Sequence, residues 1–297
     1  MIRVNHEKAW LQRYIRLEQP DLIISDNRYG LYSREVTSIF ITHQLRIRTP
    51  WGGFADEVLQ RMNYRRIRRF DLCWVPDVPG ADALAGELAG GLAGELAHPG
   101  RLPSIPTRYI GWLSRFPVAG KVEEQPCDLL VMLSGPEPQR SLLEKKLLEQ
   151  LADYTGRTVL VRGMPEGREL QGPVPPQLTV YNHLPAAALE GVIRGAGQVI
   201  ARSGYSTVMD LVRLGKRAIL IPTPGQTEQE YLGDYVSSKG WAICIAQKGF
   251  SLADALAVAR GRGNALPRDE GELLKAEIAA VLSAGFGIVE EPELGTR

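Results

Sequence analysis

Short, unbroken apolar runs alternate in this sequence with stretches that carry apolar residues at helical spacing. Runs of this kind suit strands that are covered on both faces, and their alternation with helices is typical of parallel βα units. We therefore predict an α/β fold with parallel sheets and helices on both faces. The predicted strands are 22–25, 39–42, 72–75, 129–133, 159–161, 178–181, 199–201, 218–221 and 242–245, and the predicted helices are 6–19, 141–153, 229–239, 251–260 and 270–282.

The chain has 297 residues, which predicts two domains, because one domain usually has about 100 to 200 residues. The stretch WLSRFPVAGKVEEQPC (112–127) joins the last strand of the first half to the next, and we place the boundary near Pro117. The predicted domains are residues 1–116 and 117–285, followed by a solvated tail, 286–297. The second domain has enough strands for a complete doubly wound sheet. The first opens with a helix, so we expect a reduced domain or a fragment.

The net charge, the cysteines and histidines, and the apolar segments each argue against certain classes of protein. The formal net charge of +1 gives no support to a nucleic-acid-binding protein, which is strongly basic overall or in one domain. The cysteines and histidines are too dispersed for a disulfide framework or a metal cluster. The sequence has neither a membrane span nor a signal peptide, so we expect a cytoplasmic protein without a metal or cofactor.

Three polar loops follow predicted strands of the second half, at the edge where open α/β sheets bind ligands. They are 134–140, 202–206 and 222–230. The second loop opens a helix, and its small residues and free helix amides predict a phosphate site. Asp210, early in that helix, either complements the helix dipole or accepts hydrogen bonds from a sugar diol. Gln229 and Glu230 are either solvated helix surface or ligand contacts.

These loops, in this order, resemble the C-terminal domain of family 28 glycosyltransferases, enzymes of the GT-B fold that include the MurG type of peptidoglycan synthesis. The matching stretches are Ser134-Gly135, the block RSGYSTVMD (202–210) and the block PTPGQTEQEYLG (222–233). The resemblance covers about residues 128–283. It implies two Rossmann-like domains, the N-terminal one incomplete and lacking the family's first strand and Gly-rich loop.

The resemblance implies a donor site for a nucleotide-sugar, usually a UDP-sugar. The loop from Arg202 lies beside the diphosphate, and Asp210 binds the ribose hydroxyls, where MurG-type enzymes have Glu. Gln229 and Glu230 match a pair of residues that binds the hydroxyls of the donor sugar, although MurG-type enzymes have two glutamines at these positions. His183 falls in the base-binding loop, and Arg115 matches an arginine at the domain hinge. The full set of predicted donor residues is Arg115, Ser134, Gly135, His183, Arg202, Ser203, Gly204, Ser206, Asp210, Gln226, Gln229 and Glu230.

Acceptor-side residues are predicted in the first half. Residues 25–33 and 40–45 each follow a strand and look like the acceptor loops of the same fold. His43 stands where MurG-type enzymes have a His-Glu pair, and a histidine that only caps a strand end is an equal alternative. We take His43 and Asp26 as candidate catalytic residues. Asn27 and Arg28 are candidate acceptor contacts.

The segment Arg61–Phe70, RMNYRRIRRF, has arginines interleaved with apolar residues. On a helix this pattern is either a solvated face or a peripheral contact with an anionic membrane on its cytoplasmic side. A lipid-linked acceptor, as in MurG-type enzymes, would favour the membrane contact.

Together these features predict a metal-independent, inverting transfer of a sugar from a nucleotide-sugar to an acceptor hydroxyl. Two alternatives stay open. One is a nucleotide-sugar hydrolase or epimerase on the same fold, and the other is a noncatalytic fragment that only binds nucleotide-sugar.

Overall fold

The computed structural model describes residues 2–49, 51–79, 91–117, 122–167, 170, 174–260, 266–267 and 271–283. The chain divides into two compact units, one of Met1–Trp112 with Asp269–Arg297 and the other of Leu113–Arg268. The predicted boundary near Pro117 is thus close to the observed one. The prediction that residues up to 285 belong to the second domain is wrong, because the segment from Asp269 belongs to the first unit. The predicted tail, 286–297, lies outside the described residues.

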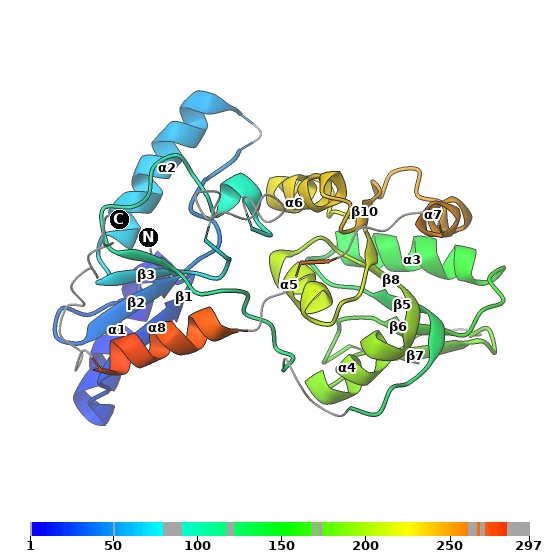
Figure 1. Cartoon of the computed structure of the whole chain (residues 1–297), viewed down its shortest axis with the longest axis horizontal. Coiled ribbons are helices and arrows are strands. Elements are labelled where there is room, and N and C mark those ends of the chain that lie inside the picture. Colours follow the sequence, from blue (N-terminus) through cyan, green and yellow to red (C-terminus); the bar gives the residue numbers. More distant parts are fainter. Residues whose placement is uncertain are drawn as a thin grey trace, which may run out of the picture. The chain divides into compact units, whose positions relative to one another are not determined.

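The first unit contains a four-stranded parallel sheet in the order β1-β2-β3-β4. The run Thr107–Tyr109 was not predicted as a strand because it lacks an apolar core, yet it pairs with β3. Figure 1 shows α2 beside the sheet. The elements are α1 (Ile2–Glu18), β1 (Leu22–Asp26), β2 (Thr37–Ile41), α2 (Gly53–Ile67), β3 (Leu72–Val75), the short 3-10 helix η1 (Gly94–Leu96), β4 (Thr107–Tyr109) and α8 (Glu272–Ser283).

Buried aromatic rings and one buried carboxylate organise the first unit. The ring of Phe40 stacks on Tyr29 and lies against Phe70, with ring centroids 5.0 and 4.8 Å apart. The carboxylate of Asp77, which is fully buried, accepts hydrogen bonds from the amides of Leu92 and Ala93, each at 2.9 Å. A buried carboxylate is stable only when such donors surround it, so Asp77 fixes the segment that precedes η1.

The second unit contains a six-stranded parallel sheet in the order β10-β9-β8-β5-β6-β7. The strand order reverses between β5 and β8, which makes this pair the switch point of a doubly wound sheet. The predicted α/β fold class is confirmed. The elements are β5 (Cys127–Met132), α3 (Gln139–Leu151), β6 (Thr158–Val161), β7 (Leu178–Tyr181), α4 (Ala186–Gly195), β8 (Ala196–Ala201), α5 (Tyr205–Arg213), β9 (Ala218–Leu220), α6 (Thr227–Ser238), β10 (Ile243–Cys244) and α7 (Leu252–Ala259).

Two helical layers cover this sheet. Leu129 and Val131 of β5 share a buried cluster with Leu143 and Leu147 of α3 and with Ala255 of α7. Figure 1 shows α4 and α5 on the opposite side from α3 and α7. Burial of one leucine side chain contributes about 1.5 to 3 kcal/mol, so this layer fixes the strands whose carboxyl ends carry the polar loops.

Helix α4 approaches the segment before β5 so closely that only glycine fits. A Cβ atom added to Gly195 would lie 2.3 Å from the carbonyl oxygen of Gln125, and one added to Gly191 would lie 2.5 Å from that of Glu123. These are backbone atoms, which cannot move without shifting the start of β5. The two glycines, four residues apart, therefore set the spacing between α4 and the sheet.

We predict that Gly195→Ala lowers the free energy of unfolding by about 1 to 3 kcal/mol, the usual range for overpacking. Alanine normally stabilises a helix by up to about 1 kcal/mol relative to glycine, so the steric clash must cost more than this gain. Urea denaturation followed by circular dichroism measures the change. Gly53→Ala in α2 is the control, because nothing lies within 4 Å of its added Cβ. Equal stability of both variants would contradict the close packing of α4.

Candidate active site

The three predicted loops meet at the carboxyl edge of the second sheet. Met132 of β5 pairs with Ala201 of β8, so the loops that follow these neighbouring strands leave the sheet side by side. Gly135 adopts φ +96°, and a Cβ atom there would lie 3.5 Å from Oγ1 of Thr223 in the loop after β9. The loops thus converge at the switch point, where open α/β sheets bind ligands.

Arg202 lies inside this edge. Its side chain is 1% exposed, and its guanidinium donates to the carbonyl oxygens of Ile221 and Pro222 at 3.1 Å and to that of Gln139 at 2.8 Å. It also donates to Oε1 of Gln247 at 2.8 Å. These four hydrogen bonds engage the two Nη atoms, whereas Nε has no hydrogen-bond partner among the described residues. The contact of Arg202 with a diphosphate stays a prediction. Arg202 also positions the loops around it.

Burial of the Arg202 guanidinium has an electrostatic cost. Desolvation lowers the pKa of Arg202 to about 10, so the side chain still carries its positive charge at neutral pH. No ion pair with a carboxylate is formed by Arg202 among the described residues. The buried charge therefore depends on carbonyl and amide oxygens, which hold the loops in place.

The Pro222–Gln226 loop is closed by side chains from the start of α6. Oε1 of Gln229 accepts from the amide of Thr223, and Nε2 of Gln229 donates to Oε1 of Gln226 at 2.6 Å. Oε1 of Glu230 accepts from the amide of Gly225 at 3.0 Å. The predicted sugar contacts Gln226, Gln229 and Glu230 thus have a structural role in this loop, and their contact with a ligand stays a prediction.

Ser203 belongs to the same network. Its side chain is fully buried, and its hydroxyl donates to the carbonyl oxygen of Gln229 at 2.7 Å. Ser203 therefore ties the loop after β8 to α6. The hydroxyl proton of Ser203 is therefore used within the protein.

Helix α5 starts without a side-chain cap. Its N-cap residue is Gly204, which has no side chain to cap the helix, and nothing lies within 4 Å of a Cβ atom added to Gly204. Ser206 in the first turn is exposed. The first amides of a helix need an acceptor, and the helix dipole favours an anion at this end. This end of α5 is therefore open to a ligand.

Asp210 is the sixth residue of α5, and the first turn of this helix contains no acidic residue. The interpretation that Asp210 complements the helix dipole is therefore wrong, because that effect is limited to the first turn. Its buried carboxylate accepts from Oγ of Ser114 at 2.8 Å through Oδ1 and from Nε of Arg115 at 2.7 Å through Oδ2. The amide of Arg115 also donates to Oδ1 at 3.2 Å. An ionised carboxylate has about four acceptor positions, so one position remains for a ligand.

Arg115 and His183 differ in how close they lie to this edge. The side chain of Arg115 is 52% exposed, and its ion pair with Asp210 holds it beside α5. His183 is exposed and follows β7, the edge strand, three strand positions from β8. Strands lie about 4.8 Å apart, which places the ends of these strands about 14 Å from each other. His183 is therefore not among the three converging loops, and its contact with a base stays a prediction.

The predicted acceptor-side residues belong to the first unit. Asp26, which is exposed, ends β1, and His43 follows the neighbouring strand β2. Asn27 adopts φ +52°, and its amide donates to the carbonyl oxygen of Ile41. Arg28 forms an ion pair with Glu7 of α1 at 2.8 Å. Asp26 and His43 thus share one edge of the first sheet, and no contact tests their catalytic role.

Sequence reasoning missed residues that complete the network around Arg202 and Asp210. Gln247 follows β10, accepts from Arg202 and donates to Oε1 of Gln139. Thr223 has a buried hydroxyl without a hydrogen-bond partner among the described residues. Ser114 binds Asp210. Of these residues, only Gln247 could have been predicted, because it follows a strand next to β9. A single amide or hydroxyl side chain in a loop forms no recognisable sequence pattern.

Within the described residues, no helix combines the length and hydropathy of a membrane-spanning segment. The same residues contain no group of three or more His, Cys, Asp or Glu side chains that could hold a metal ion.

Residues 141–264 match the family model of the glycosyltransferase family 28 C-terminal domain. The chain is also similar to two bacterial enzymes, both named UDP-N-acetylglucosamine–N-acetylmuramyl-(pentapeptide) pyrophosphoryl-undecaprenol N-acetylglucosamine transferase. The enzyme of Methylobacterium sp. (strain 4-46) is 35% identical over 92 residues, which is 31% of this chain and 19% of that protein. The enzyme of Methylorubrum extorquens (strain PA1) is 38% identical over 65 residues, which is 21% of this chain and 18% of that protein. The matched stretches thus span about a fifth of these relatives.

Solved structures match over nearly the whole chain at low identity. The glycotransferase of kitacinnamycin has a TM-score of 0.57 and 16% identity, over 96% of this chain and 78% of that one. The S. aureus MnaA-UDP structure has a TM-score of 0.61 and 11% identity, over 97% and 81%. The spinosyn rhamnosyltransferase SpnG complexed with thymidine diphosphate has a TM-score of 0.55 and 16% identity, over 95% and 78%.

These similarities agree with the strand order of the second unit and with the loops at its switch point. The chain therefore has the GT-B fold, and its second unit contains the segment that is similar to the glycosyltransferase family 28 C-terminal domain.

Proposed function

We propose that this protein transfers a sugar from a nucleoside diphosphate sugar to an acceptor hydroxyl, without a metal ion and with inversion at the anomeric carbon. The observation that carries the proposal is the open N-terminus of α5 at the switch point of the sheet. It lies inside the segment that matches the family 28 domain.

The diphosphate is the group that this edge suits best. Uncapped helix amides supply hydrogen-bond donors, and the open space at Gly204 lets an anion approach the backbone. When the bond to the sugar breaks, negative charge develops on the departing diphosphate. We propose that the amides of α5 and the exposed guanidinium of Arg115 stabilise this charge.

We propose UDP as the nucleotide, since the similar curated enzymes are named for UDP-N-acetylglucosamine. Asp210 would accept a ribose hydroxyl at the one acceptor position that Ser114 and Arg115 leave open. Gln229 and Glu230, next to the Pro222–Gln226 loop, would bind the sugar. His183 would contact the base from the loop after β7.

The acceptor hydroxyl attacks the anomeric carbon from the side opposite the diphosphate, which inverts its configuration. A base removes the proton from that hydroxyl. We propose His43 or Asp26 for this role and Asn27 and Arg28 as acceptor contacts.

The acceptor we propose is a lipid-linked hydroxyl compound, because the similar curated enzymes are named for a pyrophosphoryl-undecaprenol substrate. We also propose that the protein is cytoplasmic and touches the membrane peripherally through Arg61–Phe70. Arg61, Met62, Arg65, Arg66, Arg68 and Arg69 of this segment are exposed, which supports such a contact.

We predict that incubation with UDP-N-acetylglucosamine and a lipid-linked acceptor releases UDP and forms a glycosylated lipid. Chromatography of the products separates the possible reactions. Free sugar without a glycosylated lipid would indicate a hydrolase, and an epimerised UDP-sugar would indicate an epimerase. UDP binding without any product would indicate a noncatalytic binding protein. Each of these results would contradict the proposed transfer.

We predict that Gly204→Val weakens the affinity for UDP by at least about tenfold, because the new side chain fills the space beside the helix amides. Isothermal titration calorimetry measures the affinity, and thermal melting checks the fold. Gly100→Val in the first unit is the matched control, since nothing lies within 4 Å of its added Cβ either. An unchanged affinity in Gly204→Val would remove the helix start from the site.

We predict that Asp210→Ala abolishes a preference of the wild type for UDP over 2′-deoxy-UDP. Hydrogen bonds to a charged group contribute about 1.5 to 3 kcal/mol, which corresponds to a preference of roughly 10- to 150-fold. Comparing the two ligands cancels any effect of the substitution on folding. Ser114→Ala is the control, because it loosens the same network but keeps the acceptor. A preference that survives in Asp210→Ala would exclude Asp210 from ribose binding.

A further inference from the structure

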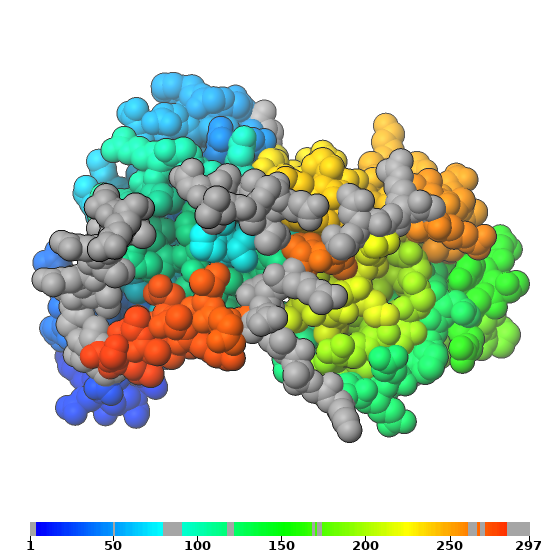
Figure 2. Space-filling view, viewed as in Figure 1, coloured from blue at the N-terminus to red at the C-terminus, as the bar shows by residue number. Residues whose placement is uncertain are grey.

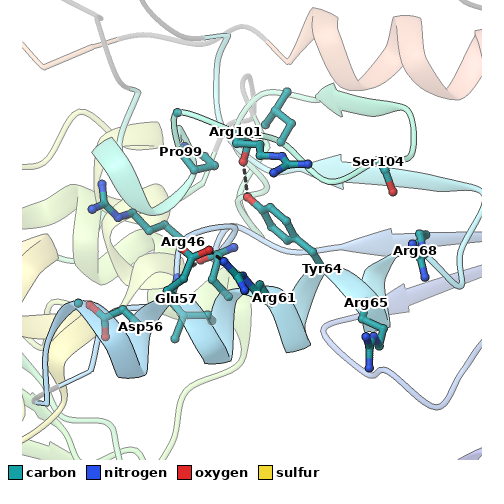
Figure 3. A pocket seen from close by; sticks show the side chains of 15 residues that line it. Arg46, Asp56, Glu57, Arg61, Tyr64, Arg65, Arg68, Pro99, Arg101 and Ser104 are labelled. Atoms are coloured by element: carbon teal, nitrogen blue, oxygen red, sulfur yellow. Dashed lines mark hydrogen bonds and ion pairs between the residues drawn. The ribbon is translucent and has the colours of Figure 1, made fainter.

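A groove of about 930 Å³ lies in the first unit, between α2 and the segment 99–104. Figure 3 shows arginines lining it from both sides, with Arg61 and Arg65 on α2, Arg68 directly after it, Arg101 opposite them and Arg46 at one end. The described residues that line the groove include five arginines and only two carboxylates, Asp56 and Glu57. The groove therefore carries a surplus of positive charge.

The two carboxylates do not cancel this surplus. Oδ1 of Asp56 accepts from the amide and the hydroxyl of Thr49, each at 2.7 Å, so this carboxylate holds the loop before α2. Glu57 forms an ion pair with Arg61 at 2.9 Å. Outside the lining residues, Glu95 forms an ion pair with Arg46 at 2.7 Å.

The remaining arginines face solvent. Arg65, Arg68 and Arg101 are exposed, and none of them forms an ion pair with a carboxylate among the described residues. In Figure 3, Arg65 and Arg68 project from the end of α2 away from Asp56. A guanidinium presents a planar fork of donors that matches a phosphate group, so this end of the groove suits a phosphate.

The wall of the groove also contains two neutral hydroxyl groups. The hydroxyl of Tyr64 donates to the carbonyl oxygen of Arg101 and so ties α2 to the segment 99–104. Burial raises the pKa of Tyr64 to about 12, so this hydroxyl stays protonated and adds no negative charge. Ser104 lines the same end and is exposed.

An exposed apolar stripe runs along α2 beside the groove. Phe54, Val58 and Met62 lie four residues apart, on one line of the helix, and are 86%, 41% and 45% exposed. Trp51, which precedes α2, is 80% exposed. Figure 2 shows α2, in blue at the top of the view, as part of the exposed surface. Arg61 and Arg65 lie on the helix between this stripe and the groove, so cationic and apolar surfaces adjoin.

We infer that this groove binds the phosphate headgroup of an anionic amphiphile, with the phosphate at Arg65, Arg68 and Arg101 and the apolar chain along Phe54, Val58 and Met62. A nucleic acid or a free phosphate would use the arginines but leave the apolar stripe exposed. The positive group of a zwitterionic lipid headgroup would be repelled by the arginines that lack a carboxylate partner, so such a lipid should bind less tightly. The inference deepens the proposed membrane contact, on which it rests, and is independent of sugar transfer.

The experiment uses the full chain and three water-soluble probes below their micelle concentrations. These probes are dioctanoyl phosphatidic acid, glycerol 3-phosphate and dioctanoyl phosphatidylcholine, and calorimetry measures each affinity. We expect phosphatidic acid to bind at least about tenfold more tightly than either of the others, because only it offers both an anionic phosphate and a chain.

Two variants separate the parts of the groove. The double variant Arg65→Gln, Arg68→Gln should lower the affinity for phosphatidic acid by at least about tenfold, the loss expected for two charge-assisted contacts. The double variant Phe54→Ser, Met62→Ser should lower the affinity for phosphatidic acid but leave the affinity for glycerol 3-phosphate unchanged. The matched control is Arg13→Gln with Arg16→Gln on α1, which removes the same charge from exposed positions of the same unit. It should leave all three affinities unchanged.

Each opposite result would overturn the inference. Equal binding of glycerol 3-phosphate and phosphatidic acid would assign the groove to soluble phosphate esters. Equal weakening by the α1 control would indicate an unspecific charge effect. Binding to vesicles that contain phosphatidic acid, without binding of the monomer, would indicate a membrane surface instead of a site. Binding of UDP, measured in the same variants, should not change, so a failure of the donor site is recognised separately.

Discussion

The candidate active site depends on one buried cation. The guanidinium of Arg202, 1% exposed, bridges the loop after β9, the start of α3 and Gln247. Removing an arginine from water costs several kcal/mol unless hydrogen bonds replace its hydration. Those hydrogen bonds come from two loops and the start of α3, so these three segments must adopt one arrangement together. That arrangement positions the start of α5, whose N-cap residue is Gly204, at the sheet edge.

Two kinds of anion site follow from different parts of this chain. The edge at α5 offers backbone amides and a helix dipole on a rigid frame, which suits a fixed anion such as a diphosphate. The groove along α2 offers exposed arginines beside an apolar stripe, which suits the headgroup of an amphiphile. These two chemistries suit the proposed nucleotide-sugar donor and the proposed membrane contact.

Much of the fold could be predicted because its strands are covered on both faces. Leu72–Val75 and Leu178–Tyr181 were predicted with the bounds that the structure has. Thr107–Tyr109 escaped because an edge strand with partly exposed residues needs no apolar run. The place of α8 in the first unit could not be predicted, since the packing of a terminal helix depends on contacts between residues far apart in the sequence.

The site was predicted less completely for a related reason. The motif indicated that Arg202, Ser203 and Asp210 gather at one edge, but the direction of each side chain depends on neighbours that the sequence does not reveal. Arg202 points inward to carbonyl oxygens, and Asp210 is shared with Ser114 and Arg115. Backbone amides, which carry the proposed diphosphate contact, have no sequence signature except the glycine and the helix that follow.

Hydrogen–deuterium exchange of the full chain with and without UDP tests the central claim most directly. The account predicts that UDP slows exchange at the amides of Gly204–Thr207, Ser134–Gly135 and Thr223–Gln226 and leaves α2 unchanged. Slower exchange confined to other segments, or no change at the start of α5 at saturating UDP, would contradict it.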